Sequence, residues 1–205
     1  MNTNKKKMDK LTLFLIPIGV AINFVGGQIA GNLGFPVYLD SIGTISVGAL
    51  CGGFPGALVG LVSNLVNSIS YPLTICYAPI SIILGFLASV FSKRGYFRHI
   101  VKVIGGMIIF GIIAGGISAI TTWLVYGFDF GVPPTSYISL PLYKIFHLPK
   151  FVCEFIASAC IDIFDKSISI VVMIGIFKAI PKRMLTKLPL GNVYLNKKSE
   201  YDDEI

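Results

Sequence analysis

The stretch LTLFLIPIGVAINFVGGQIAGNLGFPVYLDSIGTISVGALCG, residues 11–52, carries one charged side chain, Asp40. The hydrocarbon core of a membrane accepts helices of about 20 apolar residues, so a stretch of this length has room for two. Between its two apolar parts stands GFPVYLDSIGT, residues 34–44, where a proline, a tyrosine and a carboxylate interrupt the hydrophobic sequence. The pattern predicts two membrane helices with a short connection at one membrane surface.

The connection has its own signals. We expect Gly34 to end the first helix, and Pro36 fits the first turn of the second. Asp40 would then lie in that turn or at its cap, where a carboxylate complements the positive end of the helix dipole. A sharper hypothesis adds that Tyr38 and Asp40 form a gate over a ligand.

Composition extends the membrane interpretation to the whole chain. Of its 205 residues 54% are hydrophobic and 13% are charged, whereas about 25% are charged in an ordinary soluble domain. The net charge of +7 comes from basic clusters in residues 5–10, 93–102 and 178–198, at the ends of apolar runs. Such clusters are typical of residues that set membrane topology, so they do not indicate nucleic-acid binding.

Apolar sequence divides into six segments, at residues 11–33, 36–52, 55–70, 74–91, 101–126 and 151–180. The chain start lacks a small-residue cleavage site and is interpreted as a retained first helix, not a signal peptide. The second and third segments are short, and the glycine-rich turn at residues 52–56 predicts a tight hairpin between them. The fold expected is an all-α integral membrane protein with six transmembrane helices.

Charge distribution predicts the topology. Six spans place both termini and the basic connection at residues 92–100 on one side, expected to be the cytoplasmic face of the plasma membrane. The domains expected are a basic N-terminus at 1–10, a six-helix membrane domain at 11–183 and a solvated cytoplasmic tail at 184–205. The outer face receives the long connection at 127–150, which we interpret as a partly ordered lid.

The last apolar segment carries the most informative polar residues. At 100° per residue, five of them fall within about 80° of one another on a helix: Glu154, Ser158, Asp162, Asp165 and Ser169. Charges at membrane depth normally face the bundle interior or a cavity. Asp162 and Lys166 are spaced for an internal ion pair, whereas Glu154 is open to either packing or ligand contact.

Small residues line the first and third segments. One face of the third consists of Gly56, Gly60, Ser63 and Asn67, which suits close helix packing; Asn67 lies near the outer end and could instead meet a ligand. Trp123 and Tyr126 close the fifth segment, as membrane anchors or as stacking surfaces for a flat ligand.

Several sites are not expected. The four cysteines are interpreted as small buried residues and not as a disulfide framework, and the histidines lack the spacing of a metal site. The sequence contains no phosphate-binding loop, no nucleophile elbow and no HExxH motif. We therefore expect no ATPase, no enzyme, no metal and no cofactor.

Residues 18–69, IGVAINFVGGQIAGNLGFPVYLDSIGTISVGALCGGFPGALVGLVSNLVNSI, followed by YAPISIILGFLASVFSKRG, resemble the substrate-binding S components of energy-coupling factor (ECF) vitamin transporters. The likeness covers roughly residues 16–95. It implies a six-helix bundle that binds a vitamin-like molecule at the outer face and associates with a transmembrane coupling subunit and two cytoplasmic ATPases.

The resemblance also suggests where ligand and partner bind. Family members dock on the coupling subunit through an alanine-x-x-x-alanine motif in the first helix, which this sequence replaces with small residues: Gly19, Ala21, Asn23, Gly26 and Ala30. Ligand contacts are expected at the outer half of the bundle, from Tyr38, Asp40, Asn67, Tyr71, Tyr77, Trp123, Tyr126 and Glu154. Such a set suits a flat, polar, heterocyclic ligand.

Alternatives remain open. Cobalamin, pantothenate, a queuosine precursor, riboflavin or another nucleobase-like compound would fit the expected cleft. A small membrane sensor or assembly module that transports nothing would also use the small-residue faces. A membrane enzyme would have to use Glu154, Asp162 and Asp165.

Overall fold

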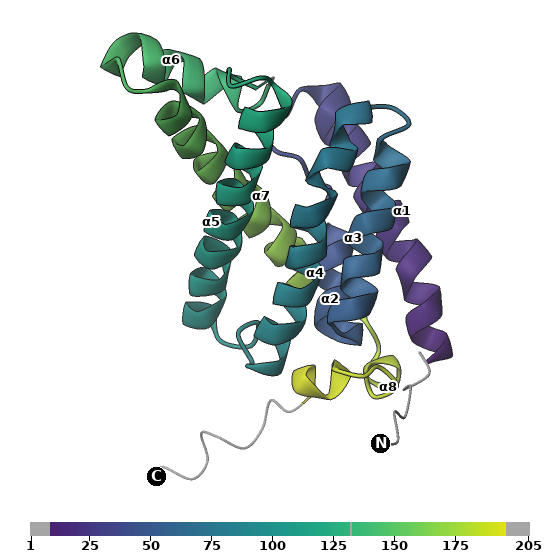
Figure 1. Cartoon of the computed structure of the whole chain (residues 1–205). Coiled ribbons are helices and arrows are strands. Elements are labelled where there is room, and N and C mark those ends of the chain that lie inside the picture. The colour runs from purple at the N-terminus through teal and green to yellow at the C-terminus, as the bar shows by residue number, and fades with distance from the viewer. Residues whose placement is uncertain (1–8, 132, 196–205) are drawn as a thin grey trace, which may run out of the picture.

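The computed structural model describes residues 9–131 and 133–195, and within them the chain is all-helical with no strand (Figure 1). This confirms the all-α prediction. The elements are α1 (Lys10–Leu33), α2 (Ile42–Cys51), α3 (Gly53–Asn67), the 3₁₀ helix η1 (Pro72–Tyr77), α4 (Ala78–Lys93), α5 (Ile100–Val125), α6 (Ser136–Phe146), α7 (Lys150–Ala179), α8 (Lys182–Leu185) and the 3₁₀ helix η2 (Gly191–Tyr194).

In the part of the chain that the structure describes, three helical stretches are long and apolar enough to cross a membrane: Lys10–Leu33, Pro72–Lys93 and Ile100–Val125. Helices α2 and α3 are apolar but shorter, and the 30-residue α7 carries buried charges. The helices are compatible with a membrane bundle, and the long apolar ones indicate a membrane protein.

The surface of the bundle is apolar where a membrane would touch it. Phe14 on α1, Val101 on α5 and Phe164 on α7 are 69%, 78% and 58% exposed. Polar residues such as Asn23 and Ser158 are instead completely buried. Large apolar side chains outside and polar side chains inside are what lipid surroundings favour.

Helix α2 lies at the centre, with all ten of its residues buried. Glycines let its neighbours approach closely: a Cβ at Gly56 would stand 2.5 Å from the Gly48 Cα, and one at Gly85 would come too close to the Ala57 backbone. The tight α2–α3 hairpin is therefore confirmed, with Gly52 at φ 110° between the two helices. Small residues here serve helix packing.

Asn23 ties three helices together inside the bundle. Its side-chain nitrogen donates to Thr44 Oγ1 at 2.8 Å and to Ser63 Oγ at 3.0 Å. Its oxygen accepts the Gly43 N–H at 2.7 Å. Gly43 lies in the first turn of α2, whose N–H groups lack partners within the helix, so Asn23 on α1 completes the start of α2.

The connection at residues 34–41 differs from the prediction. Gly34 does end α1, in the left-handed region at φ 64°. Pro36, however, lies outside α2, which begins only at Ile42 after Ser41. Asp40 is thus neither in the first turn of α2 nor its cap. The reason is tertiary, because hydrogen bonds to Asp165 hold Tyr38 and Leu39 in a non-helical conformation.

The tail also differs from the prediction for residues 185–195; residues 196–205 lie outside the described part. Leu185 and Leu188 are buried, and the Leu190 N–H donates to the Leu50 carbonyl at 2.9 Å. The Tyr194 ring packs against Phe177 with 4.8 Å between centroids. This segment lies under the bundle, at the end where both termini leave (Figure 1).

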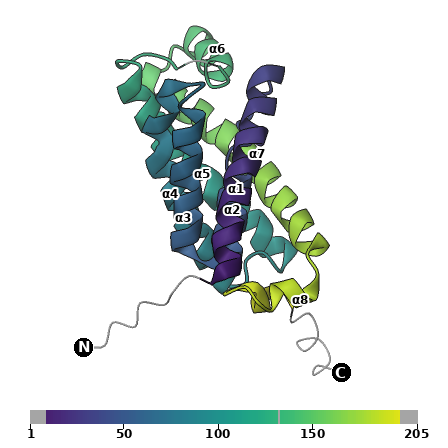
Figure 2. The ribbon, with the colours of Figure 1, turned by 90° about the vertical axis from the view of Figure 1, so that its right-hand side faces the viewer.

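The long connection is partly ordered, as expected, since it contains α6. Figure 2 shows α6 and α8 at opposite ends of the bundle. An ion pair of 2.9 Å between Asp129 and Lys150 joins the two ends of this connection. The Lys150 ammonium and the Phe130 N–H both donate hydrogen bonds to the Asp129 carboxylate. These bonds hold the pKa of Asp129 below its usual value.

All four cysteines are free thiols. Cys51 and Cys153 are buried as expected, but Cys76 and Cys160 are exposed. The expectation of buried cysteines is therefore wrong for these two, because Cys76 lies on η1 at the end of the bundle and Cys160 points outward from α7.

Candidate functional site

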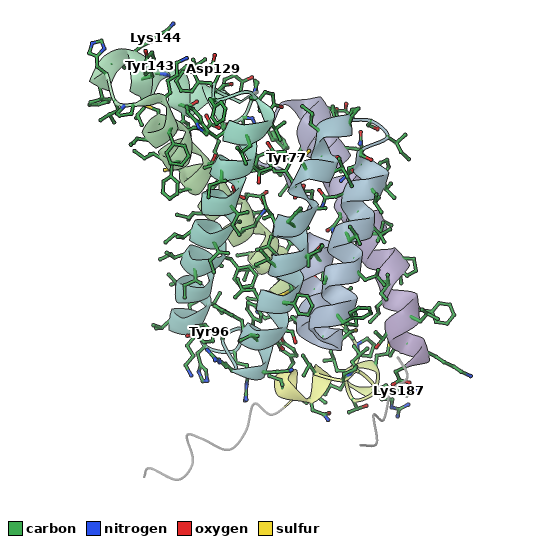
Figure 3. The ribbon with its side chains drawn as sticks, in the orientation of Figure 1. Tyr77, Tyr96, Asp129, Tyr143, Lys144 and Lys187 are labelled. Carbon is green, nitrogen blue, oxygen red and sulfur yellow. The ribbon has the colours of Figure 1, made fainter. Side chains whose placement is uncertain are left out.

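A cavity of about 480 Å³ opens between the helices, at the end of the bundle opposite the termini. Its wall combines the C-terminal parts of α1, α3 and α5, the start of α4 and the middle of α7. The loop at residues 34–41, η1 and the segment at 133–137 close it. Tyr77, labelled in Figure 3, marks its position in the half of the bundle near α6.

Charged groups gather at the α7 side of the cavity. The Lys166 Nζ lies 2.6 Å from Asp165 Oδ2 and 3.4 Å from Asp162 Oδ1. The predicted Asp162–Lys166 ion pair is thereby confirmed, with Asp165 as a second partner. All three side chains are at most 5% exposed, so the pairing offsets part of the cost of burying them.

Asp165 also fixes the loop that closes the cavity. Its Oδ1 accepts the N–H groups of Tyr38 at 2.9 Å and Leu39 at 2.7 Å. Leu39 takes a positive φ of 52°, which non-glycine residues adopt rarely. Hydrogen bonds from two backbone N–H groups to one carboxylate oxygen are charge-assisted and therefore strong. These two bonds hold the loop with Tyr38 and Asp40 beside α7.

Several cavity groups retain hydrogen-bonding capacity. Asp162 Oδ2 and Asn67 Oδ1 are buried and have no hydrogen-bond partner among the described residues. Asn64, by contrast, is engaged, because its nitrogen donates to Ser81 Oγ at 2.7 Å and to the Gly60 carbonyl at 2.9 Å.

Burial raises the pKa of the half-buried Asp40, and the Lys166 ammonium opposes that shift.

Six of the eight predicted ligand residues line this one cavity: Tyr38, Asp40, Asn67, Tyr71, Tyr77 and Tyr126. Trp123 does not; its ring packs edge-on against Phe128 and Phe151. Its role as a membrane anchor stays a prediction. The structure thus brings together residues from the first connection, from α3, from η1 and its N-terminal cap, and from the C-terminal cap of α5.

Glu154 lies close to the cavity but behind its wall. It is fully buried, and both carboxylate oxygens lack a hydrogen-bond partner among the described residues. A Cβ at Gly131 would come within 3.4 Å of Glu154 Oε1 and even closer to Thr122. The hydroxyl groups of Tyr77 and Thr122 are hydrogen-bonded to each other at 2.8 Å, and both residues line the cavity.

Sequence reasoning missed several lining residues. The spacing of Asp162 and Lys166 predicts an internal ion pair only, yet both residues line the cavity. Their position on the polar face of α7, which the structure buries as predicted, was the signal that could have found them. Ser118 and Thr122 sit in a helix apolar all round and carried no such signal.

Most of the residues expected to contact a partner subunit are buried within the helix bundle. Gly19, Asn23 and Ala30 are buried, and a Cβ at Gly26 would clash with the Leu39 carbonyl. Ala21 alone among the five is exposed. These small residues pack α1 against α2, α3 and the first connection, so a partner would meet the opposite face of α1.

The cavity has the volume of a small-molecule site, which commonly lies between about 300 and 1,000 Å³. Aromatic side chains supply contact area, and buried carboxylates and amides can orient a bound molecule. Comparisons with models of protein families, with curated proteins and with solved structures find no match for this chain. Its side chains and their geometry are therefore the basis for what the site can do.

Proposed function

We propose that this chain is the substrate-binding S component of an ECF-type importer, which captures a vitamin-like molecule and delivers it through a coupling subunit and two ATPases. The observation that carries the proposal is the cavity of about 480 Å³, which collects most of the residues expected to contact a ligand. The family resemblance of residues 16–95 supplies the transport role.

Two further features support this role. Tyr77, which lines the cavity, lies in the half of the bundle away from Tyr96, which stands in the basic connection at residues 93–102 (Figure 3). Capture at the outer face requires this arrangement if the basic connection faces the cytoplasm. Part of its wall, the loop at 34–41, is attached to α7 through a few hydrogen bonds. Such a loop can move to admit a ligand without unpacking the helices.

The first test is copurification. Full-length protein expressed with an ECF coupling subunit and its ATPases should copurify with them, and mass spectrometry of the isolated chain should find one bound small molecule. Failure to copurify with any ECF coupling subunit would contradict the proposal.

The second test is uptake. Vesicles holding the assembled complex should accumulate the labelled molecule only with ATP. Asn67→Ala, which alters the cavity wall, should reduce uptake about tenfold or more, and Asn192→Ala at the opposite end should leave it unchanged. A sensor or assembly module would bind without accumulating.

A further inference from the structure

We propose that the cavity selects an organic cation, a flat molecule carrying a protonated amine or an amidinium group. This inference rests on the proposed role in small-molecule binding and names the class of molecule bound. It follows from which polar groups around the cavity are already paired and which are free.

The charges do not balance at the α7 side. Three carboxylates, those of Asp40, Asp162 and Asp165, surround one ammonium group, Lys166. Among the described residues, no other lysine, arginine or histidine lines the cavity. With every group in its usual charge state, the formal balance is two negative charges, which favours a positive ligand.

Asp165 is not available to a ligand. Its Oδ1 accepts two backbone N–H groups, and its Oδ2 accepts the Lys166 ammonium at 2.6 Å. Lys166 is held by Asp165 and, more loosely, by Asp162. The single cation of the site is thus paired with two protein carboxylates, which offset its attraction for an anionic ligand.

Among the fully buried side-chain atoms of the residues that line the cavity, the two without a hydrogen-bond partner in the described part of the chain are both acceptors. Asp162 is 3% exposed and Asn67 is 7% exposed, and each has one oxygen without a hydrogen-bond partner among the described residues. Both line the cavity. Leaving a buried acceptor unpaired costs free energy, and more for a charged one, so a ligand that brings N–H donors recovers part of this cost.

The shape of the ligand follows from the walls. Tyr38, Tyr71, Tyr77 and Tyr126 face the cavity from different elements. Aromatic faces attract cations and stack on flat molecules. A metal ion fits poorly, because no group of three histidine, cysteine or acidic side chains with the geometry of a metal site occurs in the described part of the chain.

The test uses three probes of equal shape and different charge. Benzamidine is a flat cation, benzamide its neutral counterpart and benzoate its anionic counterpart. Thermal unfolding of the full-length protein in detergent should be shifted upward by benzamidine, with a Kd at least tenfold lower than that for benzamide. Benzoate should give no shift. Equal or tighter binding of benzamide or benzoate, or no shift with benzamidine, overturns the inference.

Variants of the acidic residues test whether the cavity carboxylates cause the preference for benzamidine. Asp162→Asn should raise the Kd for benzamidine about tenfold or more and leave that for benzamide nearly unchanged. Asp40→Asn, in the loop and outside the ion-pair cluster, should act in the same direction and serves where Asp162→Asn does not fold. Asp129→Asn, in the exposed ion pair and not among the residues that line the cavity, is the control. An undiminished preference in both cavity variants would contradict the assignment.

The outcomes separate this inference from the proposed function. If the copurified or transported molecule is neutral or anionic, the transport role stands and the inference falls. If the chain prefers benzamidine but joins no ECF coupling subunit, the cation site stands and the transport role falls.

Discussion

Asp165 connects parts of the chain that lie 126 residues apart, because one of its oxygens binds the loop backbone at Leu39 and the other binds Lys166. A single carboxylate therefore sets the conformation of the loop and the position of the ammonium. The charges that surround the cavity depend on this one side chain.

The variant Asp165→Asn tests this role. Its amide side chain could keep one acceptor for the loop but would leave Lys166 with Asp162 as its charged partner. We expect the free energy of unfolding to fall by about 2–4 kcal/mol, measured by denaturant or thermal unfolding in detergent. Asp129→Asn, in an exposed pair, should change it little. Equal losses in both variants would contradict the role of burial.

Tyr194 gives a pH-dependent prediction. The Ser92 hydroxyl donates to the Ala49 carbonyl at 2.7 Å, so Tyr194 is the donor in its 2.7 Å bond with Ser92. Burial raises the pKa of Tyr194 above its usual value. The folded state thus retains this proton longer than the unfolded state, and stability falls as the pH rises above about 10.

The measurement compares the wild type with Tyr194→Phe. The difference between their phenolate absorbance titrations should show one tyrosine with a midpoint above the ordinary value. At neutral pH the variant should lose about 1 kcal/mol for the missing hydrogen bond. A midpoint at the ordinary value would place Tyr194 in water and contradict the docked tail.

At the scale of helices, glycine positions decide how closely α2, α3 and α4 approach. A Cβ at Gly85 would overlap the backbone of Ala57 and Gly56, while one at Gly105 on α5 would meet nothing within 4 Å. Backbone atoms cannot move aside as a flexible side chain can. The same substitution should therefore have different consequences at the two positions.

We expect Gly85→Ala to lower the free energy of unfolding by about 1–3 kcal/mol or more. Gly105→Ala should leave it unchanged or raise it slightly, since alanine favours helix. Thermal unfolding in detergent compares the two. If Gly85→Ala leaves the free energy of unfolding unchanged, α3 and α4 pack less closely than in the structure.

At the scale of the whole molecule, the start of α1, the basic connection and η2 lie at one end of the bundle (Figure 1). The residues that line the cavity lie in the other half. The positive charges predict that the first end is cytoplasmic. The native cysteines allow a direct test, because Cys76 is exposed beside the cavity while Cys51 and Cys153 are buried.

Because Cys160 is also exposed, the test starts from Cys160→Ser. In intact cells, a membrane-impermeant maleimide should label this variant and not the double variant Cys76→Ser/Cys160→Ser. A cysteine introduced as Lys187→Cys in that background should be labelled only after the membrane is opened; Figure 3 labels Lys187 at the end where the termini lie. The reverse pattern would invert the topology and remove the cavity from the outer face.

Local patterns were sufficient for much of this architecture. The helices, the α2–α3 hairpin, the end of α1 at Gly34 and the buried polar face of α7 all follow from periodicity and glycine placement. These features depend on residues within a few turns of one another. Six of the predicted ligand residues also line one cavity. Polar side chains at membrane depth normally face the bundle interior or a cavity, so they gather there.

Tertiary structure decided the rest. Pro36 stays outside α2 because Asp165, far along the chain, binds the intervening loop. Residues 185–195 pack against the end of the bundle because apolar side chains such as Leu188 are buried there. The spacing of Asp162 and Lys166 predicted that they pair, but not that both line a cavity or that one oxygen of Asp162 has no partner among the described residues. Sequence periodicity determines which face of a helix is polar; only packing determines what that face meets.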